Sequence, residues 1–217
     1  MGRTTRAVLG NRIRAGMQVA DVGANQGIFT LLMSRLVGPQ GLVVAVEPEA
    51  TMAGVLSRNL RANGVSNVTL VEAAAGSQAG EATLFRSLTN AGDNRLARGE
   101  FPESCRRSSV SVVRLDDVVP DHWLDFIKID TQGWEVAVLE GMPCCLRENP
   151  KLVILFEFWP YGLRNAGRDP ADLLAMLRDL GFKILTAKGS TIASTETSTF
   201  LKRFRARRYV DLLAVRP

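Results

Sequence analysis

Apolar and polar positions follow two alternating patterns along the chain, one typical of buried strands and one typical of helices. Short apolar runs such as VADV (19–22) and LVVAVEP (42–48) are each followed by a segment whose apolar residues recur every three or four positions. Repetition of this unit predicts a parallel sheet covered by helices on both faces. We therefore expect an α/β fold built on a doubly wound sheet of seven strands, the last of them antiparallel.

The same two patterns predict the remaining helices and strands. Helices are expected where apolar residues recur every three or four positions and the segment ends at a glycine or begins with a capping aspartate and a proline. Strands are expected at the apolar runs between these helices. The polar stretch 189–199 is expected to be a mobile loop between the last two strands. The remaining strands of the sheet are expected at 67–73, 125–130, 151–158, 182–186 and 209–215, with a short hairpin partner at 81–85 and a further extended stretch at 109–117, and the helices at 27–38, 49–64, 133–142 and 170–181.

A polar turn, DVGANQG (21–27), joins the first expected strand to the helix that follows and forms a candidate ligand site. A helix N-terminus offers unpaired N–H groups, and glycines let a ligand approach the backbone. Dinucleotide-binding turns follow GxGxxG, but Asn25 stands where the second glycine belongs, so the turn disfavours a dinucleotide. The residues expected to contact the ligand are Asp21, Gly23, Ala24, Asn25 and Gly27.

Acidic residues at neighbouring strand ends indicate which ligand this is. Asp21 would repel a pyrophosphate but suits cationic groups, and Glu47 is placed to accept hydrogen bonds from both hydroxyls of a ribose. S-adenosylmethionine combines a sulfonium, an ammonium and a ribose diol. Glu72 and Ala73, after the third strand, are expected near its adenine. The alternative is that Asp21 caps a helix, Glu47 is a surface carboxylate and Glu72 lies in an exposed loop.

Composition predicts one domain without disulfides. A chain of 217 residues buries roughly 70% of the surface that its unfolded form exposes, so its core needs neither a disulfide nor a metal. We expect residues 1–217 to form this domain, with 1–17 as a short N-terminal extension. Three cysteines without metal-type spacing, two of them adjacent, and no signal peptide or membrane span predict a cytoplasmic protein.

The net charge of +5 and the pI near 9.5 favour anionic partners, including nucleic acid. Much of the excess lies in LKRFRARR (201–208), which we interpret as a solvated face. Nucleic-acid binding would require aromatic residues among the charges, and Phe204 is the only one in this segment.

With these segments identified, the chain resembles the FkbM-type methyltransferases, which depend on S-adenosylmethionine and have the Rossmann-like sheet of class I methyltransferases. The resemblance covers most of the chain from Val19 onward. It implies that 1–217 form one methyltransferase domain that methylates a hydroxyl oxygen on a small metabolite, a sugar or a polyketide-like product. The motifs that carry it are DVGANQG, VVAVEP, NAGDNRL, VRLDDVV and FIKIDTQGWEVAVLEG, in that order.

The resemblance also implies site residues. Asp130, Gln132, Gly133 and Glu135 match the segment that lines the pocket after the fourth core strand, with Asp130 and Gln132 on the cofactor. On the substrate side, a loop over the pocket is matched by Asn90, Asp93 and Asn94, and Trp134 stands where a small residue is expected. Trp134 either narrows the substrate side or packs into the core.

A hydroxyl nucleophile must lose its proton, which requires a base or a metal. Asp130 and Glu157 end the fourth and fifth core strands, and we expect Asp130 to act as base or orienter with Glu157 in support. A divalent metal shared by the two carboxylates is an alternative that we do not predict, because the Asp-Asn pair of metal-dependent catechol methyltransferases is missing. A further alternative gives both carboxylates positioning roles. His122, the only histidine, precedes a strand at the opposite end and is expected to be structural or solvent-facing.

Other functions remain open at this stage. A ribose 2′-O-methyltransferase acting on RNA is one, and a cofactor-binding protein without catalysis is another. A nicotinamide dehydrogenase is disfavoured by Asn25, and a base N-methyltransferase by IDTQGW (129–134) in place of an Asn/Asp-Pro-Pro-aromatic motif. The expected partner is a small hydroxylated acceptor, without nucleic acid or membrane, and a homodimer would be ordinary for this size.

Overall fold

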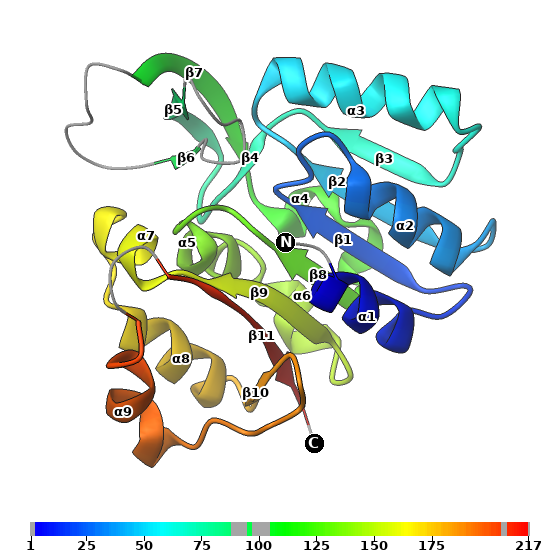
Figure 1. The fold of residues 1–217 in the computed structure, drawn as a ribbon. Coiled ribbons are helices and arrows are strands. Elements are labelled where there is room, and N and C mark those ends of the chain that lie inside the picture. Colours follow the sequence, from blue (N-terminus) through cyan, green and yellow to red (C-terminus); the bar gives the residue numbers. More distant parts are fainter. Residues whose placement is uncertain (1–2, 88–94, 97–104, 205–207, 217) are drawn as a thin grey trace.

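The computed structural model describes residues 3–87, 95–96, 105–204 and 208–216. Its main feature is a seven-stranded sheet in the order β10-β11-β9-β8-β1-β2-β3, with helices on both faces (Figure 1). β11 runs antiparallel to both of its neighbours and the other pairs are parallel, which confirms the predicted sheet. The strands are β1 (Gln18–Val22), β2 (Leu42–Val46), β3 (Val68–Val71), β8 (Phe126–Ile129), β9 (Val153–Phe158), β10 (Lys183–Thr186) and β11 (Val210–Val215).

The strand order creates a switch point at the carboxyl ends of β1 and β8. From β1 the chain moves outward to β2 and β3, and it later returns to the other side of β1 to form β8. In such sheets, ligands bind outside the carboxyl ends of the strands where the order reverses. The register sets Asp21 of β1 opposite Lys128 of β8, and Glu157 of β9 opposite Asp211 of β11. The sheet therefore brings these four charged residues toward one edge.

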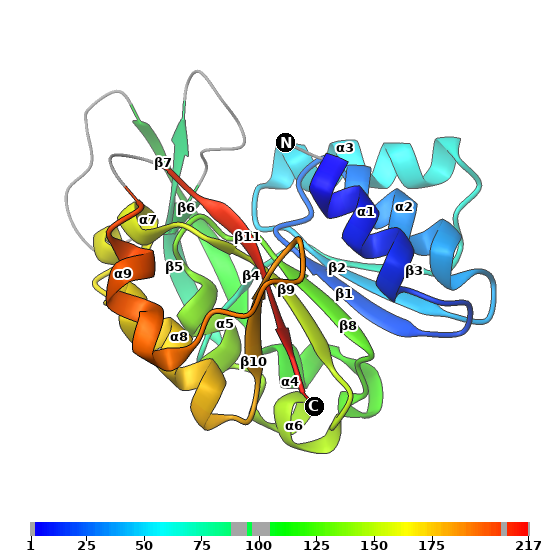
Figure 2. The same ribbon diagram turned by 60° about the horizontal axis from the view of Figure 1, so that its bottom comes forward.

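Helices cover the two faces of the sheet unequally. α1, α2 and α3 lie on one face, and most of the others on the opposite face (Figures 1 and 2). The face under α4, α5, α6 and α8 holds the larger hydrophobic core, since parallel strands need both faces covered. The helices are α1 (Arg3–Arg12), α2 (Ile28–Val37), α3 (Ala50–Ala62), α4 (Leu115–Val118), α5 (Glu135–Glu140), α6 (Pro143–Glu148), α7 (Pro160–Asn165), α8 (Pro170–Asp179) and α9 (Thr197–Leu201), with the 3₁₀ turns η2 (Pro120–His122) and η3 (Ser194–Glu196).

Several segments differ from the expectations. The predicted extended stretch 109–117 ends at Val113, and residues 115–117 begin helix α4; helices α6 and α7 were not predicted. The N-terminal extension contains α1, whose Val8 and Leu9, with Ile13 just beyond it, are buried against the sheet. The predicted mobile loop 189–199 contains η3 and most of α9, so its assignment as a loop was wrong. The polar composition of 189–199 predicted no burial, but Ile192 within the segment and Phe200 just after it are buried in the larger core. These two side chains hold the segment on the protein.

A second, four-stranded sheet in the order β4-β7-β5-β6 is inserted between β3 and β8. It stands beyond the carboxyl ends of β1 and β8 (Figure 1). Its long hairpin pairs β5 with β7 in antiparallel register, which confirms extended structure at 81–85 and 109–113. The strands are β4 (Ala74–Ala75), β5 (Gly80–Ser87), β6 (Arg95–Leu96) and β7 (Cys105–Val113).

Candidate active site

The glycine turn after β1 lies at the switch point. Gly23 has a φ of +79°, and a Cβ on it would lie 2.0 Å from the carbonyl oxygen of Asp130. Gly27 has a φ of +85°, and a Cβ on it would lie 2.1 Å from Cδ1 of Leu56 in α3. Glycine is therefore required at both positions, by conformation and by space. Gly27 precedes α2 and has no side chain to cap it, so the turn leaves the N-terminus of this helix to backbone or ligand partners.

Glu47, directly after β2, holds the turn from the neighbouring strand. Its carboxylate accepts the Asn25 N–H at 2.8 Å on Oε2 and the Glu49 N–H at 2.9 Å on Oε1. Burial, which leaves only 6% of the residue exposed, raises its pKa, and these two backbone bonds oppose the shift. Each carboxylate oxygen has two lone pairs, so one acceptor position per oxygen remains after these bonds. That is the capacity that a vicinal diol requires.

Asp21 is directed into the protein. Its side chain is fully buried, accepts the hydroxyl of Thr30 at 2.7 Å, and lies 3.5 Å from Nζ of Lys128. Burial raises the pKa of Asp21, and the Lys128 charge opposes that shift. These contacts fix the end of β1 to α2 and β8. A direct contact between the Asp21 carboxylate and a cationic ligand stays a prediction.

Lys128 is a buried ammonium in the middle of β8, with 4% of the residue exposed. Nζ lies 3.3 Å from Oδ2 of Asp130 and 5.2 Å from the ring centroid of Phe29, which comes from α2. Burial alone would lower the pKa of Lys128, but the carboxylates of Asp130 and Asp21 outweigh it and raise that pKa above its ordinary value. The ammonium therefore stays charged and holds the ends of β1 and β8 together.

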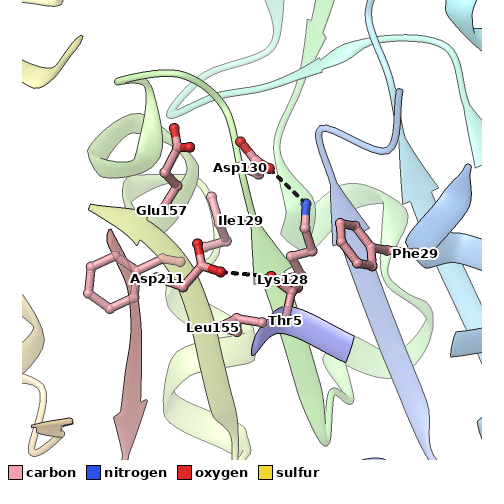
Figure 3. Close-up of a pocket in the computed structure, with 9 residues that line it drawn as sticks. Thr5, Phe29, Lys128, Ile129, Asp130, Leu155, Glu157 and Asp211 are labelled. Carbon is pink, nitrogen blue, oxygen red and sulfur yellow. Dashed lines mark hydrogen bonds and ion pairs between the residues drawn. The ribbon is translucent and has the colours of Figure 1, made fainter. Parts of the chain in front are cut away.

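Asp130, Gln132 and Glu157 form a bridged set at the carboxyl edge. Nε2 of Gln132 donates to Oδ1 of Asp130 at 3.0 Å and to Oε2 of Glu157 at 2.8 Å. Figure 3 shows both carboxylates rising from adjacent strand ends, with Lys128 reaching toward Asp130. The side chain of Asp130 is 21% exposed, whereas Glu157 is 3% exposed. Asp130 is thus the more exposed carboxylate of the pair.

The two carboxylates differ electrostatically. Burial raises the pKa of Glu157 to about 9, and the nearby charges of Asp130, Glu135 and Asp211 add to the shift. Glu157 consequently holds a proton at neutral pH. A small cavity is lined by Asp130, Glu157 and Asp211. Asp211 also accepts a hydrogen bond from the hydroxyl of Thr5 in α1 at 2.7 Å.

The loop after β8 is held by Glu135, a fully buried residue. Oε1 of Glu135 accepts N–H bonds from Thr131 and Gly133 at 3.2 and 3.1 Å, which fixes the loop that carries Gln132. Burial raises the pKa of Glu135 to about 7. Gln132 itself has a φ of +55°, and a Cβ on Gly133 would lie 2.4 Å from the backbone of Gly162, so this loop packs tightly against α7.

The remaining predicted residues fall in three places. Glu72 is exposed after β3 and Ala73 beside it is buried, which leaves their adenine contact a prediction. Trp134 packs between the larger core and the core of the second sheet. Its partly buried ring fits the packing alternative, and an acceptor contact stays a prediction. The substrate-side residues Asn90, Asp93 and Asn94 lie outside the described residues.

Three polar residues that line a small cavity were not predicted, namely the buried Lys128, the partly buried Asp211 and the uncharged Thr5 of α1. A lysine in the middle of the apolar run FIKI was the one available signal, because a buried strand position holds a lysine only when carboxylates accompany it. His122 lies in η2 before β8, at the amino end of that strand, as predicted.

Comparison with known proteins gives consistent results. The methyltransferase FkbM domain matches residues 21–184. The curated methyltransferase sdnD of Sordaria araneosa is 30% identical over 200 residues, which cover 76% of this chain and 73% of that protein. Methyltransferase 1 of Beauveria bassiana is 28% identical over 144 residues, 57% of each chain.

Solved structures share the fold. An FkbM methyltransferase from Methylobacillus flagellatus superposes with a TM-score of 0.56 at 17% identity over 92% of this chain, and the match spans 43% of that longer chain. A methyltransferase described as putative, from Streptococcus mutans in complex with S-adenosylhomocysteine, superposes with a TM-score of 0.58 at 9% identity over 98% of this chain and 96% of that one. No helix in the described part of the chain is long and apolar enough to cross a membrane.

Proposed function

The chain belongs to the FkbM methyltransferase family, and from this premise we propose that it transfers the methyl group of S-adenosylmethionine to a hydroxyl oxygen of a small acceptor. When bound, this cofactor supplies a methyl group already activated by the sulfonium. The protein has to hold it, align the acceptor, and take up the acceptor's proton. The residues at the switch point suit these three tasks.

Cofactor binding is assigned to the ends of β1, β2 and β3. The two remaining acceptor positions of the Glu47 carboxylate take the ribose hydroxyls, since two backbone donors already orient its oxygens. The turn from Gly23 to Gly27 presents backbone groups to the cofactor's amino-acid end, and Glu72 and Ala73 lie on the side of the adenine. Asp21 acts through the turn, because its carboxylate is buried against Thr30 and Lys128.

The bridged carboxylates carry the proposal of O-methylation. A hydroxyl acceptor gives its proton to Asp130, the more exposed carboxylate, while Gln132 and Lys128 hold Asp130 in place. Glu157 stays protonated beneath it because of burial and neighbouring charge. An amine acceptor with a free lone pair would not need such a base, so the arrangement favours oxygen over nitrogen.

The basic segment supports a small acceptor over RNA. The ring of Phe204 packs edge-on against Phe158 at 5.4 Å and Phe200 at 5.0 Å, within the aromatic group beside the larger core. The one aromatic side chain in the basic segment is therefore committed to packing and is not free to stack on a base. The proposal includes that residues 1–217 act as one domain, in the cytoplasm and with a small acceptor as partner. It requires no particular oligomeric state, and a homodimer would be compatible with it.

The first test is calorimetric titration with S-adenosylhomocysteine. We expect micromolar binding by the wild-type chain and a loss of at least about tenfold in Glu47→Gln, with NAD not binding. Glu140→Gln is the matched control, because it makes the same chemical change at a carboxylate outside the proposed cofactor site. Glu140 lies on α5, and its carboxylate pairs with Arg168 at 2.7 Å. Thermal unfolding of each variant shows whether it remains folded. A folded wild-type chain that binds neither ligand would refute the cofactor assignment.

The second test measures transfer of labelled methyl groups to a panel of hydroxylated metabolites and to RNA. At saturating cofactor, Asp130→Asn should lower the rate by roughly 10²–10⁴-fold, the usual contribution of a positioned base. Salt-sensitive methylation of RNA with no small-molecule product would replace the proposal by the RNA alternative. Cofactor binding without turnover on any acceptor would favour the cofactor-binding alternative.

A further inference from the structure

A group of three potential metal ligands lies at the amino end of β8, at the opposite edge of the sheet from the candidate active site. It consists of His122 from η2 and of Cys144 and Glu148 from α6. One ligand atom from each of the three residues lies within 4.8 Å of the other two, and Nδ1 of His122 is 3.6 Å from Oε2 of Glu148. In the described part of the chain, this is the one group of at least three His, Cys, Asp or Glu residues that meets this spacing.

Buried side chains hold the two segments that carry these ligands. Asn149 is 2% exposed, and its Nδ2 donates to the carbonyl oxygens of His122 and Cys145, each at 2.7 Å. The buried carboxylate of Asp116 accepts the N–H groups of Cys144 and Cys145, each at 3.0 Å. The backbone of His122 and that of Cys144 are therefore held to buried side chains, and Glu148 follows on the same short helix. Each of the three ligand side chains is at least partly exposed.

The backbone at His122 is in an unfavourable conformation. Asp121 and His122 have φ values of +51° and +54°, in the left-handed region where residues other than glycine are uncommon. Asn149 donates a hydrogen bond to the carbonyl oxygen of His122 in this conformation, and Nδ1 of the imidazole lies 3.6 Å from Oε2 of Glu148 in α6. Cys144 and Glu148 are four residues apart on that helix, so they share one face.

The donor atoms are one nitrogen, one sulfur and one oxygen, a set that suits a borderline-soft ion such as Zn²⁺. Zinc–ligand distances of about 2.0–2.3 Å in a tetrahedron place donor atoms roughly 3.5 Å apart. The His122–Glu148 distance of 3.6 Å already fits this spacing. The side chains of His122 and Glu148 are 39% and 43% exposed, so small rotations can bring the other donors closer and leave a fourth position to water.

A cation already lies at this group. Nη2 of Arg147 is 3.5 Å from Sγ of Cys144 and 3.0 Å from Oε1 of Glu148. Its guanidinium therefore contacts the same sulfur and carboxylate that a metal ion would ligate. Because the Arg147 side chain is 68% exposed, it can turn into solvent when a metal ion takes its place.

We propose that His122, Cys144 and Glu148 form a binding site for a divalent transition-metal ion of the Zn²⁺ class, separate from the methyl-transfer site. A metal ion bound there would link η2 to α6. Because η2 is the element that directly precedes β8, the start of that strand would be held as well. The site makes no contact with the cofactor turn, so its occupancy can be tested whether or not the proposed methyl transfer is correct.

The test is a zinc titration of the full chain after chelator treatment, in a non-thiol reductant and against a chromophoric chelator. We expect one equivalent of Zn²⁺ to bind, unaffected by excess Mg²⁺, which prefers oxygen ligands. His122→Ala, Cys144→Ser and Glu148→Gln should each weaken binding at least about tenfold, as for other changes around metal sites. Arg147→Ala should strengthen it several-fold, because the metal ion no longer has to displace a cation.

Cobalt provides a second, spectroscopic readout. Co²⁺ should give a thiolate-to-metal charge-transfer band that is present in the wild-type chain and absent in Cys144→Ser. Glu140→Gln and Cys105→Ser are the controls for a carboxylate outside the site and for another thiol, and both should bind zinc as the wild type does. The proposal is overturned if the wild-type chain binds no stoichiometric zinc, or if His122→Ala and Cys144→Ser bind it as tightly as the wild type.

Discussion

At the scale of single residues, the candidate site is dominated by an imbalance of buried charge. One ammonium, that of Lys128, is within electrostatic reach of the carboxylates of Asp130, Asp21 and Glu157. Three negative charges around one positive charge in a buried region would leave repulsion uncompensated. The repulsion is relieved by a proton on Glu157, the carboxylate whose pKa burial raises to about 9.

This proton makes the stability of the fold depend on pH. The folded-state pKa of Glu157, about 9, is above its ordinary value of 4.5, so folding favours the protonated form. The contribution of this proton to the free energy of unfolding is complete below about pH 4.5 and is lost as pH rises through 9. The free energy of unfolding changes by no more than about 1.4 kcal/mol per pH unit in this range. Replacing Glu157 by the neutral Gln should remove this dependence while keeping an acceptor for Gln132.

We therefore expect Glu157→Gln to gain stability relative to the wild type as pH rises from 5 to 8.5, by a few kcal/mol in the free energy of unfolding. Urea unfolding at several pH values measures this. The control Glu140→Gln, which changes a carboxylate away from this buried group, should show the same pH dependence as the wild type. Curves for Glu157→Gln and the wild type that stay parallel would show that Glu157 is ionised in the folded protein.

At the scale of elements, the close approach of β1 and β8 depends on Gly23. An alanine there would meet two penalties, because φ is +79° and because its Cβ would lie 2.0 Å from the Asp130 carbonyl oxygen. Gly64 after α3 is a matched control, since its φ is +64° and its Cβ would meet nothing within 4 Å. Comparison of the two alanine variants separates the free-energy cost of the left-handed backbone from that of the steric clash with Asp130.

We expect Gly64→Ala to lower the free energy of unfolding by about 1–2 kcal/mol, the cost of the left-handed conformation. Gly23→Ala should cost roughly 2 kcal/mol more, because β1 and β8 must move apart. It should also weaken S-adenosylhomocysteine binding at least tenfold, whereas Gly64→Ala should leave that affinity unchanged. Equal effects of the two changes in urea unfolding and calorimetry would show that the strand ends tolerate a side chain at Gly23.

An element could be predicted from the sequence when the residues that define it lie within the element itself, and not when they come from other parts of the fold. α3 and α8 carry their own caps, Glu49 and Asp169, and both helices were predicted. α1 was missed because its few apolar residues gain their burial only from the sheet. The site follows the same rule. Glu47 could be placed because it directly follows an apolar strand, whereas the partners of Lys128 come together only through the strand register.

At the scale of the whole molecule, the two sheets meet at Trp134. This residue follows β8, and its ring packs both on the larger core and on the core of the second sheet. Its Nε1 is buried and has no hydrogen-bond partner among the described residues. Behind it, a Cβ on Gly141 would lie 2.0 Å from the carbonyl oxygen of Gly76, so the junction of the two sheets is tightly packed.

Trp134→Ala should therefore cost roughly 3 kcal/mol in the free energy of unfolding, because it removes a ring shared by two cores. Trp134→Phe keeps most of that packing and removes a buried N–H without a partner, so its stability should stay within about 1 kcal/mol of the wild type. Urea unfolding followed by circular dichroism measures both. If Trp134→Phe loses as much stability as Trp134→Ala, the indole N–H has a stabilising partner that the described contacts do not include. If Trp134→Phe instead keeps its stability but changes KM for the acceptor, then Trp134 also lines the substrate side.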